Sequence, residues 1–285
     1  MRAPGTPRGW MRLRITTRLA AGVVIVFAAA GYFAPRLAPF PRDLIQLEQG
    51  GHPPSASHLF GTDMLGRDVL SRILHGGRVS LAVATVATLV AVAIGTLLGA
   101  LAGYLGGRVD TAISALVDTA LSLPLFFLVL LLGQRWGASL GTLCIVVGLA
   151  SWMPVARLVR QTTSGLRHRA FVEAACGFGF GTARVLARHV LPSTAAPILV
   201  ASALGAAQAV LMESALGFLG FGLQPPTPSW GGMLHEAQSH LRDAPWLAVF
   251  PGSCIFLLVL ALHALADAGQ NALDPRARGE RTVRG

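Results

Sequence analysis

Residues 169–192 read RAFVEAACGFGFGTARVLARHVLP and form the longest polar interruption in the second half of an otherwise apolar chain. Charged side chains are interspersed there with apolar ones, a mixture that favours short helices resting against a larger structure. Three glycines between residues 177 and 181 break the helical pattern, because glycine disfavours helix interiors and permits left-handed turns. Thr182 is placed to cap a second short helix, and Pro192 is expected to stop it. The stretch therefore predicts a helix–hinge–helix knob that serves as a docking surface.

The composition of the whole chain indicates a polytopic membrane protein. Of its 285 residues, 53% are hydrophobic and 13% are charged, against roughly 25% charged in a soluble domain. All 23 basic residues are arginines, so the chain lacks the lysine that a phosphate-binding P-loop requires. The net charge of +10 is spread over segments between apolar runs, which favours a topology signal over nucleic-acid binding. The three scattered cysteines are interpreted as core residues, and no metal site is expected.

Six apolar runs are long enough to cross a bilayer as helices of about 20 residues, which predicts an all-α membrane protein with six transmembrane helices. A cleaved signal peptide is the alternative for the first run, but an uncleaved helix is favoured because further spans follow. The later runs cover about 79–103, 111–134, 138–159, 194–218 and 245–268. The predicted organisation is a basic cytoplasmic tail 1–18, a first transmembrane helix 19–34, an extracytoplasmic loop 35–78, a five-helix core 79–268 that includes the polar loop 160–193, and a cytoplasmic C-terminal tail 269–285.

The distribution of arginine predicts the orientation of the chain. With a cytoplasmic N-terminus, the inner segments hold 16 arginines and the outer segments hold 7. Cytoplasmic loops carry the excess of basic residues in membrane proteins. Both termini and residues 169–192 are therefore expected on the cytoplasmic side, where ATP is available.

The opening stretch resembles the EAA loop of the inner-membrane subunits of bacterial ABC importers. The motif is carried by Glu173, Ala174, Ala175, Gly179, Leu191 and Pro192. The resemblance implies that these residues, with Arg169, couple the chain to an ATPase subunit. Cys176 and Gly177 stand where related subunits usually carry Arg and Ala, so the first helix is expected to end early. The alternative is an ordinary amphipathic loop between two helices, which would not need this spacing.

Two further stretches resemble the C-type permease of dipeptide, oligopeptide and nickel importers. They are HLFGTDMLGRDVLSRILHGGRVSL at residues 58–81 and ESALGFLGFGLQPPTPSWGGML at residues 213–234, and ALDPRA at 272–277 is also similar. The residue pattern of the first predicts a short amphipathic helix on the membrane surface, with Gly76–Gly77 as its stop. Its polar face would carry Arg67, Asp68, Arg72 and His75. A second surface helix is expected within 230–242.

Candidate functional residues also occur inside the spans. Gly95, Gly99 and Gly103 recur every four residues and predict close packing of another helix; lipid-facing small residues are the alternative. Ionisable groups are costly in a bilayer and indicate a pathway or a structural pair. Gln208, Glu213 and Asp118 are therefore the translocation-path candidates, with Glu213 the strongest and a structural role left open. The eight histidines are interpreted as solvated surface residues.

The resemblance implies the permease subunit of a type I ABC importer in a bacterial inner membrane, moving peptides, nickel or a similar small solute into the cytoplasm. It also implies short cytoplasmic coupling helices, a homologous second permease subunit, two cytoplasmic ATPases that bind ATP and Mg, and an extracytoplasmic substrate-binding protein. The chain itself would hold no cofactor and catalyse no reaction. An ion-coupled secondary transporter is the alternative, but neither mid-membrane coupling groups nor inverted repeats are found. An intramembrane enzyme would need a nucleophile or a metal set, and the sequence offers neither.

Overall fold

The computed structural model describes residues 7–136 and 139–273, and within these ranges the regular secondary structure is helical, with no strand. This confirms the predicted all-α class. Five helical segments are long and apolar enough to cross a membrane, and a sixth qualifies only as a pair of helices bent by 88°. The membrane-length helices are α1 (Pro7–Tyr32), α3 (Val69–Leu105), α6 (Leu140–Ala150) joined to α7 (Trp152–Arg167), α10 (Leu191–Phe218) and α12 (Trp246–Leu273), and the bent pair is α4 (Gly107–Ser122) with α5 (Leu125–Trp136).

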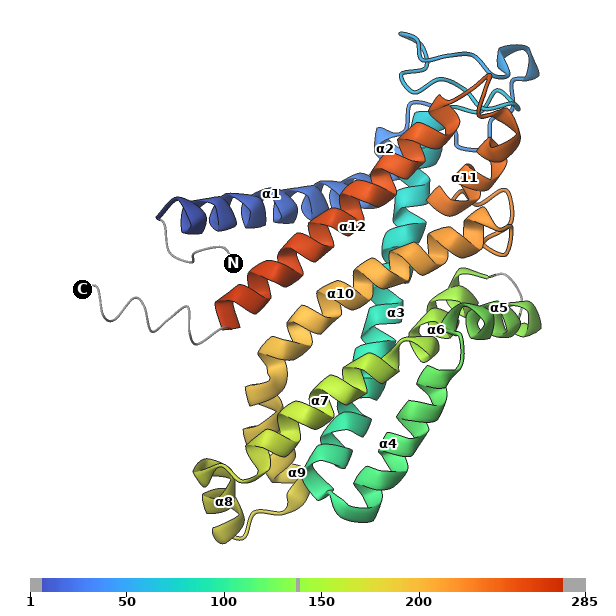
Figure 1. Cartoon of the computed structure of the whole chain (residues 1–285). Helices are drawn as coiled ribbons and strands as arrows, with labels where there is room; N and C mark the ends of the chain where they lie inside the picture. The colour runs from blue at the N-terminus through green and yellow to red at the C-terminus, as the bar shows by residue number, and fades with distance from the viewer. Residues whose placement is uncertain (1–6, 137–138, 274–285) are drawn as a thin grey trace.

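Helix α3 organises the bundle. It has 37 residues and runs the length of the molecule, with α7 and α10 packed along it (Figure 1). Three buried apolar clusters lie along α3 in turn, and each joins it to different partners. Burial of apolar area supplies the main stabilising term within such a bundle, so the remaining helices take their positions from α3.

The short elements gather at the two ends of this bundle. At the top of Figure 1 lie α2 (Ala34–Leu37), the turn Leu47–Gln49, and α11 (Trp230–Ala237) with the turn Gln238–His240. The helices α8 (Ala170–Gly177) and α9 (Thr182–Val185) lie at the opposite end. The predicted outer loop 35–78 and the predicted inner loop 160–193 are therefore separated by the full bundle. Their assignment to the two sides of a membrane stays a prediction.

The predicted surface helix between residues 62 and 77 is wrong. Residues from Val69 onward are the first turns of α3, whose N-cap is Asp68, and the helix passes through Gly76 and Gly77 without a break. These glycines create room for a neighbour: a Cβ atom on Gly77 would lie 2.9 Å from Cζ2 of Trp230. The indole of Trp230 is buried and its Nε1 donates to the carbonyl oxygen of Ile73 at 3.0 Å. Close packing, rather than helix termination, explains the glycine pair.

Several other boundaries differ from the sequence-based ones. Helix α1 begins at Pro7, so the described part of the predicted tail 1–18 is helical. Helix α12 extends to Leu273, while residues 274–285 of the predicted tail 269–285, with most of 272–277, lie outside the described residues. The fourth span is interrupted at Ser151, between α6 and α7.

Candidate functional site

The knob predicted from residues 169–192 is an elbow formed by α8, a turn and α9, held against the bundle on one side. Val172 and Ala175 of α8 are buried in an apolar cluster with residues of α3, α7 and the start of α10. Glu173 and Ala174 on the same helix are exposed. Arg169 precedes α8, and its carbonyl oxygen accepts the backbone N–H groups of Val172 and Glu173. One face of the elbow is thus packed on the bundle, and the other face is exposed.

The turn of the elbow depends on Gly179, which has a φ of +77°. The left-handed region is open to glycine and unfavourable for most other residues. The N–H of Gly179 donates to the carbonyl oxygen of Cys176 at 2.9 Å, and that of Phe180 to Ala175 at 3.2 Å. Helix α8 ends at Gly177. These two hydrogen bonds tie the turn back onto α8 and define its shape.

Two details of the predicted elbow are wrong. Thr182 is the first residue of α9 and not its cap, because Gly181 occupies the N-cap position without a side-chain hydrogen bond. Pro192 does not stop a helix: residues Leu186–Val190 form a π-helical turn, and Leu191–Pro192 open α10 directly after it. Thr182–Phe218 is consequently one membrane-length segment of 37 residues. The wider π turn accommodates a residue without a backbone N–H, which a regular helix interior does not.

The three spaced glycines of α3 face α7. A Cβ atom on Gly95 would lie 2.7 Å from the carbonyl oxygen of Trp152. On Gly99 and Gly103 it would meet the carbonyl oxygens of Ala156 and Arg160. The two backbones approach so closely that no side chain fits between them. Helix α7, which leads into the elbow, is therefore packed directly on α3.

The three translocation-path candidates have different environments in the structure. Glu213 is fully buried, and its Oε2 accepts a hydrogen bond from Ser80 of α3 at 2.9 Å. In this conformation Glu213 makes a structural contact that joins α10 to α3, and its place in the translocation path stays a prediction. Gln208 and Asp118 are exposed. Asp118 of α4 accepts a hydrogen bond from Nη2 of Arg157 of α7 at 2.5 Å, a partner that the sequence did not indicate.

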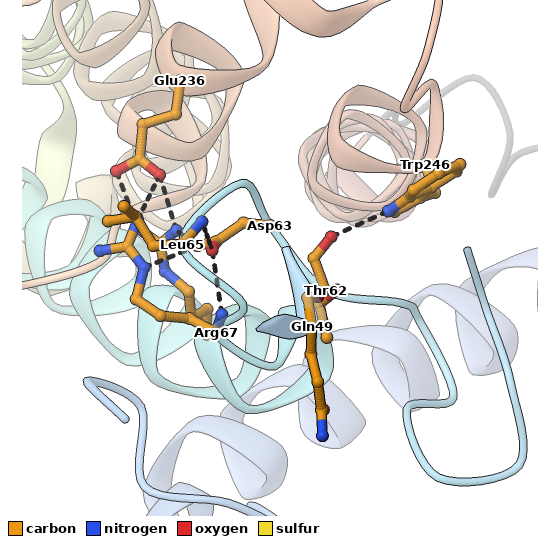
Figure 2. A network of polar contacts seen from close by, with 8 residues as sticks. Gln49, Thr62, Asp63, Leu65, Arg67, Glu236 and Trp246 are labelled. Atoms are coloured by element: carbon orange, nitrogen blue, oxygen red, sulfur yellow. Dashed lines mark hydrogen bonds and ion pairs between the residues drawn. The ribbon is translucent and has the colours of Figure 1, made fainter. Parts of the chain in front are cut away.

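A buried ion cluster, which we call the outer clasp, was missed by sequence reasoning (Figure 2). It consists of Asp63, Arg67, Arg72 and Glu236. Asp63 Oδ2 accepts from Arg67 Nε at 2.6 Å and from Arg72 Nη1 at 2.5 Å. Glu236 of α11 accepts from both arginines, with Arg72 donating Nη1 and Nη2 at 2.6 and 2.9 Å. Two acids and two bases neutralise one another, which removes most of the cost of burying charge.

A second polar group beside the outer clasp corrects the interpretation of His58 as a solvated residue. His58 is 7% exposed. Its Nδ1 lies 2.9 Å from Asp68 Oδ1, and its Nε2 lies 2.9 Å from Gln49 Oε1. In the same region Thr62 and Trp246 are joined by a hydrogen bond of 3.2 Å from the indole Nε1 to the Thr62 carbonyl oxygen. The charged motif of residues 58–72 therefore fastens the outer loop to α3, α11 and α12.

Comparisons with known proteins agree with this architecture. Residues 95–279 match the family described as binding-protein-dependent transport system inner membrane component. A Brucella suis biovar 1 protein assigned as a peptide permease is 40% identical over 255 residues, covering 89% of this chain and 84% of the relative. The glutathione transport system permease protein GsiD of Shigella flexneri serotype 5b is 39% identical over 273 residues, covering 95% and 90%. The chain therefore belongs to the family of binding-protein-dependent transport system inner membrane components, which are permease subunits of ABC importers.

Proposed function

We propose that this chain is the permease subunit of an ATP-driven importer that moves peptides, including glutathione-sized ones, into the cytoplasm. The chain matches proteins named as peptide and glutathione permeases, and each match covers most of both sequences. Nickel is a second candidate solute, and it rests only on the resemblance of residues 58–81 and 213–234 to the C-type permeases of dipeptide, oligopeptide and nickel importers. The partners would be a homologous permease, two ATPase subunits that bind ATP and Mg, and an extracytoplasmic substrate-binding protein. The chain would lie in a bacterial inner membrane with both termini cytoplasmic.

The observation that carries the coupling proposal is the two-sided elbow. Val172 is 1% exposed and Ala175 is 4% exposed, whereas the side chain of Phe178 at the tip is 79% exposed. A large apolar side chain in water is unfavourable by about 1.5–3 kcal/mol relative to its buried state, so a protein partner is expected to cover it. We assign this surface, with Glu173 and Ala174, to contact with the ATPase subunit.

The elbow is also suited to transmit movement. Its α9 continues through the π turn into α10, and the segment Thr182–Phe218 has no break. Its α8 follows α7, which is locked onto the glycines of α3. An ATPase that closes on ATP would therefore displace two spans together. Nucleotide can shift the equilibrium between inward-facing and outward-facing states only if the contacts differ between them, and an anchored elbow provides such contacts.

Charge reversal at the exposed face of the elbow tests the proposal. The Glu173→Arg variant is expected to weaken copurification of the ATPase subunits and to reduce ATP-dependent uptake of glutathione or trialanine into proteoliposomes. Glu48→Arg is the matched control, because Glu48 is also an exposed acid and belongs to the turn Leu47–Gln49 at the other end of the bundle. Unchanged copurification in the Glu173→Arg variant would contradict the coupling role. Uptake that persists without ATP but collapses with the ion gradient would instead indicate a secondary transporter.

A further inference from the structure

Two interruptions of membrane helices lie next to one another inside the bundle. Helix α4 ends at Ser122 and the chain turns through 88° into α5. The break between α6 and α7 falls at Ser151. Val117 near the end of α4 packs in one cluster with Met153 at the start of α7, which brings the two breaks together. Irregular backbone at membrane depth occurs only where it is buried in protein or lines a water-filled cavity.

An exposed ion pair joins α4 and α7 a few residues away from these breaks. Asp118 and Arg157 have side chains that are 64% and 58% exposed, and they line a small hollow between α3, α4 and α7. The neighbouring pair of Asp110 and Arg160 is more covered, at 27% and 41%, and is bidentate. An exposed ion pair contributes only about 0–1 kcal/mol. The Asp118–Arg157 pair therefore opens at little cost when another charged group approaches.

The position of this pair excludes a lipid-facing role. Asp118 lies 11 residues after the start of α4, and Arg157 lies 10 residues before the end of α7. At 1.5 Å per residue, Asp118 lies about 15 Å from the start of α4, and Arg157 lies about 15 Å from the end of α7. A charge that faces the hydrocarbon of a bilayer is costly, up to roughly 2.5–3.5 kcal/mol at the bilayer centre on insertion scales. Such an exposed pair must face water or another protein, and the adjoining helix breaks favour water.

We propose that Asp118 and Arg157 line the translocation path and bind the charged groups of a peptide as it passes. Arg157 would receive the carboxylate of the peptide, and Asp118 would receive its ammonium group, each replacing the other partner of the pair. A guanidinium and a carboxylate side by side suit a zwitterion, since each end finds an opposite charge. The helix breaks would place uncapped backbone groups beside the same path. This inference rests on the proposed import of peptides.

Thiol labelling tests whether the pair faces water in the assembled transporter. In a chain with Cys144, Cys176 and Cys254 replaced by Ser, the Asp118→Cys variant is expected to react at least tenfold faster with a charged, impermeant methanethiosulfonate than the Leu116→Cys variant. Leu116 is also exposed, but two residues along a helix it points to the opposite side. Ser122→Cys repeats the test on the face of Asp118 without disturbing the ion pair. If Asp118→Cys and Ser122→Cys both react slowly, in nucleotide-free and in vanadate-trapped complexes, the second permease covers the pair and the proposal is overturned.

A neutral double variant tests the contact with peptide. Asp118→Asn with Arg157→Gln is expected to raise the KM for import of trialanine or glutathione by about three- to tenfold, while the ATPase activity of the complex persists. The control is Arg42→Gln with Asp43→Asn, an ion pair with side chains 38% and 45% exposed, a few residues before the turn Leu47–Gln49 at the other end of the bundle. An unchanged KM in an importing complex would refute peptide contact and leave the coupling role intact. If the complex that contains the unaltered chain shows no ATP-dependent import of peptide, the proposed function itself is refuted.

Discussion

Replacing Gly179 by Ala isolates the backbone conformation of the elbow from every other property of the turn. Gly179 has a φ of +77°, and no atom lies within 4 Å of the position that a Cβ would occupy. The left-handed conformation costs an L-residue about 1–2 kcal/mol, and steric overlap adds nothing. We therefore expect the docking geometry to be destabilised by that amount, which corresponds to a roughly 5- to 30-fold loss in a two-state equilibrium.

The affinity of the ATPase subunit for the permease pair in nanodiscs measures this loss. Gly177→Ala is the matched control, since Gly177 also faces open space but is not among the glycines with positive φ. Ala is favoured over Gly in a helix by about 1 kcal/mol, so the control should bind as well as the unaltered chain. Gly179→Asn should lie between them, because Asn tolerates the left-handed region. Equal affinities for Gly179→Ala and Gly177→Ala would refute the argument that this turn must be left-handed for docking.

Two further changes probe the framework that holds the elbow and the outer loop. Gly99→Ala places a methyl group against the carbonyl oxygen of Ala156, so α3 and α7 must separate. We expect the free energy of unfolding to fall by about 1–3 kcal/mol, which is measured as a lower melting temperature in detergent. Gly22→Ala is the control and should not lower the melting temperature, because its Cβ would meet nothing within 4 Å. Glu236→Ala leaves the buried Arg72 with one carboxylate fewer. Because Glu236 is 33% exposed, we expect the free energy of unfolding to fall by about 2 kcal/mol, which is below the range for a fully buried pair. A melting temperature unchanged from wild type would contradict this.

The features that sequence could predict were local and periodic. The apolar runs predicted the class and most of the spans, because a helix crossing a bilayer needs about 20 apolar residues. The four-residue spacing of Gly95, Gly99 and Gly103 pointed to close helix packing, and the structure places all three against α7. The break after residues 173–175 was likewise visible, because Gly179 signals a turn that other residues disfavour.

The features that sequence could not predict depend on contacts between distant residues. Gly76 and Gly77 look like a helix stop until Trp230, more than 150 residues later, is seen to fill the space beside them. Arg72 looks solvated until Glu236 is known to lie beside it. The partner of Asp118 is Arg157, which comes from α7 and lies 39 residues later in the sequence. Periodicity assigns a side chain to one face of a helix, and it does not say what covers that face.

The outer clasp has a consequence for the biogenesis of the protein. Arg67 and Arg72 are synthesised 169 and 164 residues before Glu236, so during synthesis they remain without one of their two counter-charges. Cells add roughly 5–20 residues per second, which leaves these guanidinium groups hydrated for about ten seconds or more before α11 emerges. The first half of the chain therefore cannot complete the outer clasp by itself. A nascent chain that stalls before residue 236 would display two arginines that share the single carboxylate of Asp63, an excess positive charge by which quality-control proteases could distinguish it from a finished subunit.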